Sequence, residues 1–247
     1  MCARYTLRCG AAAVGSLFDL DEVLEFAPRY NIAPTQDVPG VVANAHGTRV
    51  LRTYRWGLIP RWADDLGIGQ RMINARSESL QERPAFRDAF RQRRCLLPAD
   101  GFYEWVEEEV ARAVPSDPQA SLFGDAQEPA VIKTTVVKQP YHIRRLDGRP
   151  FAFAGLWDAW TSPEGHAVES CTVVTTEPND LLRPIHDRMP VILSPDAFDL
   201  WLDPEFEEAE ALNALLVPCD PEGWEANAVS PMVGNPRNED PRCLDPR

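Results

Sequence analysis

The chain has 247 residues, a length that suits one large domain or two small ones and permits a continuous buried core. Hydrophobic residues make up 44% and charged residues 26%, which argues against collagen-like, coiled-coil and wholly disordered chains. The formal charge of -13 argues against a protein that binds polyanions through net charge alone.

The predicted elements begin with a short amphipathic helix at residues 14–26, where apolar residues recur at helical spacing. Residues 30–35 are expected to form a loop. Two apolar runs, 40–44 and 50–56, flank a His-Gly pair and predict a β-hairpin.

Farther along the chain, Ser79 and Glu82 form a possible capping box ahead of Pro84, which predicts a short helix. Ser194 and a following Pro open another helix that runs to Leu202. Between these helices, β-type segments dominate, at residues 95–97, 101–106, 141–145, 151–157 and 170–176.

Strands interrupted by short helices, without regular βαβ alternation, predict an α+β fold: one domain over residues 1–247 with a curved, barrel-like mixed β-sheet and short flanking helices. Residues 107–137 have few large apolar groups and are expected to form a flexible surface insertion, and residues 239–247 a disordered tail. Charge is uneven: residues 49–94 hold eleven Arg and five acidic residues, a local balance of 11 - 5 = +6.

No apolar run is long enough to span a bilayer, and the amino terminus is a poor signal peptide because its Ala- and Gly-rich stretch runs into acidic residues. A cytoplasmic protein, associated with the nucleoid when bound to DNA, is therefore expected. Six Cys without a CxxC pair or paired His ligands predict reduced thiols, with no metal site and no cofactor.

Cys2 carries distinctive chemistry because loss of Met1 would leave a 1,2-aminothiol. With an α-amino pKa of about 7.7 to 8.0, part of the amine is neutral near pH 7. The amine can capture an aldehyde as a Schiff base, and the thiol can close a five-membered thiazolidine ring. The alternative is an incidental Cys that keeps its Met1 and packs as a small hydrophobe.

The wider sequence contains eight motifs in unbroken order, which together resemble the SRAP (SOS response-associated peptidase) family of abasic-site processing proteins. The motifs read Met1-Cys2-Ala3-Arg4-Tyr5, Tyr30-Asn31-Ile32-Ala33-Pro34, Trp56-Gly57-Leu58-Ile59-Pro60-Arg61-Trp62, Ile73-Asn74-Ala75-Arg76-Ser77-Glu78, Arg94 to Trp105, Phe153-Ala154-Gly155-Leu156-Trp157, Val174-Thr175-Thr176-Glu177-Pro178 and Ile185-His186-Asp187-Arg188-Met189-Pro190. Ala3 stands where the family usually has Gly, so the amino-terminal turn must accommodate a Cβ.

The resemblance implies a monomeric protein that binds single-stranded DNA and covalently captures the aldehyde of an abasic site, with associated lyase and Met1-removing peptidase activity. It implies that Cys2 is the crosslinking nucleophile and that Asn74 orients its amine. It also implies that Glu104 is a catalytic carboxylate and His186 the acid/base. A chemical need supports the last two roles, because opening the sugar hemiacetal and expelling water both require proton transfer.

The resemblance further implies contacts with DNA. Arg can bind phosphate through its planar fork, and Pro or Trp can offer a flat surface to a base. The expected DNA-binding residues are Arg4, Pro34, Trp62, Arg76, Thr175 and Arg188.

Two other functions are compatible with parts of the sequence. An amino-terminal-nucleophile amidohydrolase would also use Cys2, with its α-amine as the base. A non-covalent single-stranded DNA-binding module would use the basic segment, and its affinity would fall steeply with salt.

Overall fold

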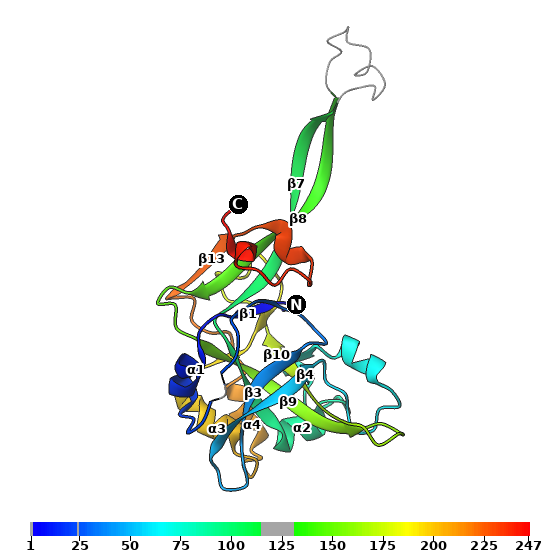
Figure 1. Ribbon diagram of the computed structural model, residues 1–247, viewed down its shortest axis with the longest axis vertical. Helices are drawn as coiled ribbons and strands as arrows, with labels where there is room; N and C mark the ends of the chain where they lie inside the picture. The colour runs from blue at the N-terminus through cyan, green and yellow to red at the C-terminus, as the bar shows by residue number, and fades with distance from the viewer. Residues whose placement is uncertain (1, 24, 115–130) are drawn as a thin grey trace.

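The computed structural model describes residues 2–23, 25–114 and 131–247, and Figure 1 shows the course of the chain. Its α-helices are short: α1 (Ala11–Phe18), α2 (Arg87–Gln92), α3 (Phe198–Leu202) and α4 (Ala209–Ala214). The 3-10 helices are η1 (Leu66–Arg71), η2 (Ser77–Ser79), η4 (Pro195–Ala197), η5 (Pro231–Gly234) and η6 (Pro241–Leu244). The strands are β1 (Tyr5–Leu7), β2 (Arg29–Ile32), β3 (Asp37–Ala43), β4 (Arg49–Trp56), β5 (Asn74–Arg76), β6 (Arg94–Ala99), β7 (Gly101–Val114), β8 (Val131–Arg145), β9 (Phe151–Thr161), β10 (Ala167–Thr176), β11 (Met189–Pro190), β12 (Ile192–Leu193) and β13 (Trp224–Ala228).

Five strands, β3, β4, β6, β9 and β10, form a closed barrel. β3 and β4 are an antiparallel hairpin, as predicted, and β3 pairs with β6, β6 with β9 and β9 with β10. The ring closes because β10 also pairs in parallel with β4. The predicted α+β fold with a barrel-like mixed sheet is therefore confirmed.

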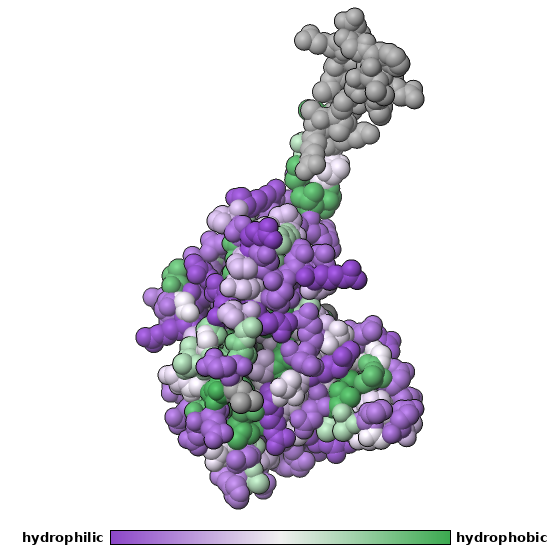
Figure 2. Space-filling model, in the orientation of Figure 1, coloured by the Kyte–Doolittle hydropathy of each residue, from purple (hydrophilic) through white to green (hydrophobic). Residues whose placement is uncertain are grey.

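A second sheet, in the order β13-β8-β7-β1-β2, lies beside the barrel. Only Asp100 separates β6 from β7, so the chain passes directly from the barrel into this sheet. β7 and β8 then extend as a two-stranded arm away from the rest of the protein (Figure 1). Hydrophobic side chains lie on the arm below the grey atoms in Figure 2, among them Ile132 and Val136.

The arm changes the interpretation of the predicted insertion at residues 107–137. Residues 107–114 and 131–137 are not loops: they are paired strand ends, in a register that continues to Val114 opposite Val131. Residues 115–130 lie outside the described residues.

Strand β1 is anchored by aromatic side chains, which matters because Cys2 comes three residues before it. Tyr5 is fully buried, and its ring meets the rings of Trp56 and Phe153 at centroid distances of 5.3 and 5.7 Å. Phe102 on β7, which lies opposite Tyr5, also contacts Phe153. The barrel and the second sheet thus share one core, and β1 crosses it.

A buried polar network also fixes β1. The Thr6 hydroxyl donates to Asp100 Oδ1 at 2.6 Å, and Thr6 Oγ1 lies 3.2 Å from His142 Nε2. Because the Thr6 proton is used by Asp100, the His142 Nε2–H must be the donor in the second bond. Burial lowers the pKa of His142 to about 3, which keeps its ring neutral at pH 7. A Cβ on Gly101 would overlap His142 Nε2, so only Gly fits there.

Several predicted boundaries differ from the structure. The first helix, α1, ends at Phe18, where Asp19 adopts a left-handed conformation, instead of continuing to residue 26. Residues 29–32 are strand β2 and not a loop, because β1 pairs with them. The helix after Pro84 begins only at Arg87, whereas the helical segment from Pro195 to Leu202 agrees with the prediction.

The carboxyl-terminal segment, residues 229–247, is ordered against β2, which corrects the prediction of a disordered tail at residues 239–247. The Glu239 carboxylate accepts the backbone N–H groups of Tyr30 and Asn31, and Asn31 Nδ2 donates to three carbonyls of the segment. Cys243 is fully buried. These bonds satisfy backbone N–H groups of β2 and backbone carbonyls of the carboxyl-terminal segment, and such long-range partners cannot be predicted from local sequence.

In the described part of the chain, no helix is long and apolar enough to cross a membrane.

Candidate functional site

The amino-terminal residues run along β7 toward a surface hollow. The backbone N–H of Tyr103 donates to Arg4 O at 3.0 Å and continues the pairing that begins between β1 and β7. The Cys2 side chain is fully buried, and its thiol donates a weak hydrogen bond to Arg4 O at 3.8 Å. Burial, reinforced by the negative charge of Glu104, raises the pKa of the Cys2 thiol. The thiol is therefore protonated in this environment.

Asn74 connects the barrel to Cys2. It begins β5, which pairs in parallel with β10, and its Nδ2 donates to Cys2 O at 2.8 Å. Its Oδ1 atom is buried and has no hydrogen-bond partner among the described residues. A buried amide oxygen without a partner carries a desolvation cost unless a donor reaches it, so this atom is available to accept one.

Glu104 and His186 face one another across the hollow. Glu104 lies on β7 with its side chain only 2% exposed, and its Oε2 is 3.8 Å from Nε2 of His186, on the loop between β10 and β11. Burial raises the pKa of Glu104 to about 7 and lowers the pKa of His186. Glu104 can therefore hold or release a proton near neutral pH, whereas burial favours the neutral form of the His186 ring.

The other ring nitrogen of His186 has two neighbours. Arg188 donates its backbone N–H to Nδ1 at 3.0 Å, and Asp187 Oδ1 lies 2.8 Å from the same atom. Both contacts come from residues that directly follow His186 in the loop.

The hollow has a volume of about 740 Å³ and is lined by five segments of the chain. Ala3 comes from the amino terminus, Glu104 from β7, His186 from the loop before β11, and Gly234 from the carboxyl-terminal segment. Lys138 on β8 adds a positive charge and lies 3.5 Å from Glu107, which also lines the hollow. A larger hollow, about 940 Å³, lies against the β3–β4 hairpin and contains none of the predicted site residues.

The structure brings the four predicted catalytic residues together. Asn74 contacts the Cys2 carbonyl, Glu104 acts electrostatically on the Cys2 thiol, and His186 faces Glu104. Their catalytic roles stay predictions. No cluster of three His, Cys, Asp or Glu side chains suited to a metal ion occurs within residues 2–23, 25–114 and 131–247.

The predicted DNA-binding residues differ in accessibility. Arg76 is exposed on β5, and Trp62 is 55% exposed on the loop after β4. Pro34 is half-buried beside Thr35, whose φ is 72°. Thr175 is fully buried, so its side chain is poorly placed to contact a ligand directly. DNA contact by these residues stays a prediction.

Arg188 is already engaged by protein groups. Its Nη1 and Nη2 donate to the two Glu78 carboxylate oxygens at 2.6 and 2.9 Å, and Nη2 also donates to Thr175 O. The Arg188 side chain is 13% exposed, so a phosphate that binds it must approach its exposed part or compete with Glu78.

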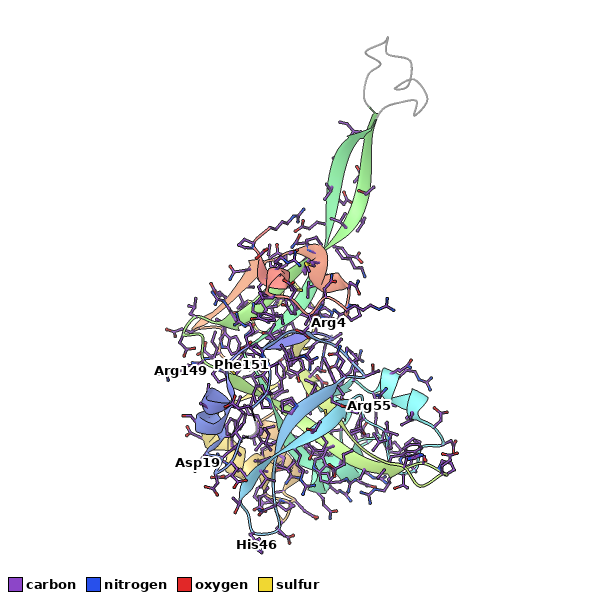
Figure 3. The ribbon with its side chains drawn as sticks, viewed as in Figure 1. Arg4, Asp19, His46, Arg55, Arg149 and Phe151 are labelled. Atoms are coloured by element: carbon purple, nitrogen blue, oxygen red, sulfur yellow. The ribbon has the colours of Figure 1, made fainter. Side chains whose placement is uncertain are left out.

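Arg4, which is labelled in Figure 3, is held by protein groups. Its Nη1 donates to Asn31 Oδ1 at 2.8 Å and to Val233 O at 2.7 Å. These bonds join the amino terminus, β2 and the carboxyl-terminal wall of the hollow. The structure therefore gives Arg4 a structural role that the sequence did not indicate.

Two further residues near the site were not singled out from the sequence. Glu78 is the partner of Arg188, and Asp187 contacts the His186 ring. Both lie inside motifs that also contain predicted site residues, Ile73 to Glu78 and Ile185 to Pro190. Their positions within those motifs were the available signal, but their partners could not be known before the fold.

Comparison with known proteins gives a consistent result. The profile of a family described as SOS response associated peptidase (SRAP) matches residues 1–236. The abasic site processing protein YoqW of Bacillus subtilis (strain 168) is 38% identical over 248 residues, which cover 99% of each chain. The abasic site processing protein HMCES of Xenopus tropicalis is 32% identical over 234 residues, which cover 89% of this chain and 66% of that protein.

Solved structures resemble all or most of the chain. A protein from Bacteroides thetaiotaomicron superposes with a TM-score of 0.78 at 23% identity and 100% coverage of both chains, a likeness that concerns the fold alone. A protein from Bordetella bronchiseptica gives a TM-score of 0.69 at 25% identity, over 93% of this chain and 100% of that one. The family profile and the identity to YoqW over nearly the whole length establish that this chain belongs to the SRAP family.

Proposed function

We propose that this chain processes abasic sites in DNA by forming a covalent crosslink through Cys2. The observation that carries the proposal is the convergence of Cys2, Asn74, Glu104 and His186, which are far apart in sequence, beside a hollow that Glu104 and His186 line. The names of the relatives YoqW and HMCES, which describe abasic site processing, supply the substrate class.

The reaction begins with the loss of Met1, which frees the α-amine of Cys2. Asn74 Oδ1 is the acceptor proposed for this amine, because Asn74 Nδ2 already holds the carbonyl of the same residue at 2.8 Å. One amide side chain would then bind both backbone groups of Cys2. This arrangement fixes the orientation of the α-amine, so that its nitrogen lone pair keeps one direction and the amine does not rotate.

The covalent chemistry follows in three steps. First, the cyclic hemiacetal of the abasic sugar opens when its anomeric hydroxyl loses a proton and its ring oxygen gains one. Second, the amine adds to the aldehyde carbon, and the resulting hydroxyl leaves as water to form an imine. Third, the sulfur adds to the imine carbon while the thiol proton passes to the imine nitrogen. One water is released overall, and the product is a thiazolidine.

Glu104 and His186 supply the proton transfers. The first two steps require a group that can both accept and donate near neutral pH, and the elevated pKa of Glu104, about 7, suits that work. The third step requires a base because burial keeps the Cys2 thiol protonated. Glu104 is the base proposed here, since its charge already acts on that thiol.

Single-stranded DNA is the proposed substrate. Asn74 and Arg76 are two residues apart on β5, so their side chains lie on the same face of the strand. Arg76 would bind a phosphate beside the reacting sugar, and exposed Trp62 offers a ring on which a neighbouring base can stack. Such contacts read backbone and base shape more than sequence.

Intact mass measured before and after exposure to an oligonucleotide with one abasic site tests the proposal. The mature protein is expected to lack Met1 and to gain the mass of the oligonucleotide minus one water. Cys2→Ala is expected to give no heat-stable thiazolidine adduct, and Cys2→Ser to form an imine without the stable ring. An adduct of the wild-type kind on Cys2→Ala, or no adduct on the wild type, contradicts the proposal.

The same variants are used to test the associated lyase and peptidase activities. An imine on Cys2→Ser would allow β-elimination, so cleavage of the oligonucleotide on the 3′ side of the lesion would report lyase activity. Removal of Met1 by the protein itself is tested in cells without methionine aminopeptidase activity. It would be shown if the wild type loses Met1 there and the Cys2→Ala variant keeps it. Release of ammonia from glutamine would instead favour an amidohydrolase.

A further inference from the structure

Trp62 is carried by a tight turn in the loop after β4. The backbone N–H of Ala63 donates to Pro60 O at 2.8 Å, so Arg61 and Trp62 are the two central residues of a β-turn. Pro60 is buried, whereas Trp62 is 55% exposed. The turn therefore presents Trp62 to solvent.

The turn lies on one face of the β9–β10 pair. Asp158 and Trp160 are two residues apart on β9, and Ser170 is opposite Asp158 on β10, so the three side chains project from the same face. All three residues are buried. Ser170 Oγ accepts the backbone N–H of Ile59 at 2.8 Å, which ties the segment before the turn to this face.

Asp158 and Trp160 hold the residues on either side of Trp62. Asp158 Oδ2 accepts the backbone N–H of Arg61 at 3.1 Å, and Trp160 Nε1 donates to Ala63 O at 2.6 Å. Because both neighbours of Trp62 in the chain are bound to β9, the backbone of Trp62 is held from both sides.

The Asp158 carboxylate also binds the side chain of Arg61. Its Oδ1 accepts Arg61 Nε and Nη2 at 3.3 and 3.1 Å and the backbone N–H of Ala159 at 2.9 Å. Arg93 Nε lies 3.2 Å from the same oxygen. Hydrogen bonds to an ionised acceptor are stronger than those between neutral groups, so Asp158 is the firmer of the two supports of the turn.

The turn is also tied to the strand that carries Asn74. Leu58, four residues before Trp62, donates its backbone N–H to Met72 O at 3.1 Å, and Met72 comes two residues before Asn74. β10 pairs with β5 and also carries Ser170, so one strand supports both the turn and the strand of Asn74.

We propose that Asp158 is a positioning residue for DNA binding, which fixes the turn so that the Trp62 ring is held ready to stack on a base beside the abasic site. Trp160 gives the second support. The inference rests on the proposed function, because it takes Trp62 as the stacking surface for single-stranded DNA. A turn that is already ordered in the free protein removes the entropic cost of ordering it on binding, so loss of either support weakens DNA binding.

A double-mutant cycle measures whether Asp158 acts through Trp62. The probe is an undamaged single-stranded oligonucleotide, whose binding is followed by fluorescence anisotropy. Trp62→Ala is expected to lower the affinity by about 5-fold or more, through loss of base stacking. Asp158→Ala is expected to lower the affinity by about 3- to 10-fold in the wild type and to have no further effect in the Trp62→Ala background.

Trp160→Phe tests the same proposal with a smaller change, because Asp158→Ala also removes the carboxylate beside Arg93 and so lowers stability. Trp160→Phe removes the indole N–H that Ala63 O accepts and keeps an aromatic ring. It is expected to lower the affinity by about twofold or more.

Trp201→Phe is the matched control. Trp201, on α3, is fully buried and donates its Nε1–H to Cys95 O on β6 at 2.9 Å. The control therefore loses a buried hydrogen bond of the same kind as Trp160→Phe does. It is expected to leave the affinity for the oligonucleotide unchanged.

¹⁹F NMR of protein labelled with 5-fluorotryptophan reports on the turn without DNA. The chain has seven Trp, and the Trp62 signal is assigned by its loss in Trp62→Phe. In Asp158→Ala and in Trp160→Phe, this signal is expected to narrow and to move toward its position in the unfolded protein, because the turn becomes mobile. Trp201→Phe is expected to leave the signal unchanged.

The outcomes separate the positioning role from the proposed crosslinking. The positioning role is overturned by an unchanged Trp62 signal in Asp158→Ala, by equal losses of affinity from Asp158→Ala with and without Trp62, or by full affinity in Trp62→Ala. Each of these results has that meaning even if the wild type forms its adduct normally. Conversely, coupling between Asp158 and Trp62 in a protein that forms no adduct would support the positioning role while the proposed crosslinking fails.

Discussion

Replacement of Glu104 by Gln is expected to make the protein more stable at alkaline pH and less active. The carboxyl group is 2% exposed, and burial raises its pKa from 4.5 to about 7. The folded state therefore binds the proton more tightly than the unfolded state. Stability from this group is complete at pH values below 4.5 and is lost as the pH rises through 7.

The size of the effect follows from the two pKa values. The difference between 4.5 and about 7 corresponds to about 3 kcal/mol at 1.36 kcal/mol per unit. Ionised Glu104 thus lowers the free energy of unfolding by about this amount at pH 8, and by a few tenths of a kcal/mol at pH 4.5. Gln has nearly the same shape but does not ionise, so the Glu104→Gln variant escapes the cost.

Urea unfolding of the wild type and Glu104→Gln at about pH 4.5 and about pH 8 measures the difference. The variant is expected to gain about 3 kcal/mol relative to the wild type between the two conditions. Glu107→Gln, on the same strand but with a side chain 65% exposed, is the matched control and is expected to change stability by less than about 1 kcal/mol. Loss of a general acid/base is expected to slow adduct formation by about 100-fold or more.

A Glu104→Gln variant with the same pH dependence of stability as the wild type would refute this reasoning. That result would mean that Glu104 is as easily ionised in the folded protein as in water. Its proposed action as a proton carrier near neutral pH would then lose its physical basis, whatever the effect on the rate.

Three other predictions concern packing, DNA contact and the arm. Gly101→Ala is expected to destabilise the protein by about 2 kcal/mol or more, because the new methyl group meets the buried imidazole of His142. Gly10→Ala is the control, since its added methyl group would meet nothing within 4 Å. Chemical denaturation measures the free energy of unfolding of both variants. Arg76→Ala is expected to weaken binding to single-stranded DNA and to reduce the slope of the logarithm of the binding constant against the logarithm of the salt concentration by about 0.7. Arg91→Ala, on α2, is the control and is expected to leave this slope unchanged. Fluorescence anisotropy measures the binding constants. Replacing residues 115–130 by a short turn is expected to leave the rate of adduct formation within about twofold of the wild type. A larger loss would show that the reaction needs these residues.

Local patterns carried much of the fold. The β3–β4 hairpin and the helical segment from Pro195 to Leu202 were predictable because their turn residues and apolar spacing lie within a few residues of one another. The absence of βαβ alternation was sufficient to predict an α+β domain with a curved sheet. The residue types with suitable chemistry, including Cys2 and His186, could also be chosen from the motifs.

Distant partners decided the rest. Residues 29–32 form a strand because distant groups satisfy their backbone. β1 pairs with them, and Glu239, more than 200 positions farther along the chain, accepts the N–H groups of Tyr30 and Asn31. The expected tail is ordered for the same reason, and Arg4 turns inward because the carbonyl of Val233 lies within its reach. None of these partners can be identified by local spacing.

The sequence by itself determined which chemistry the chain carries: an aminothiol precursor at Cys2 and side chains able to move protons at positions 104 and 186. The tertiary structure decided how those groups act on one another, because distance and burial set both their contacts and their pKa values. Glu104 titrates near neutrality because β7 buries it, and Asp187 reaches His186 Nδ1 because the loop before β11 bends it there. Such properties depend on what the folded chain brings together, which no local segment encodes.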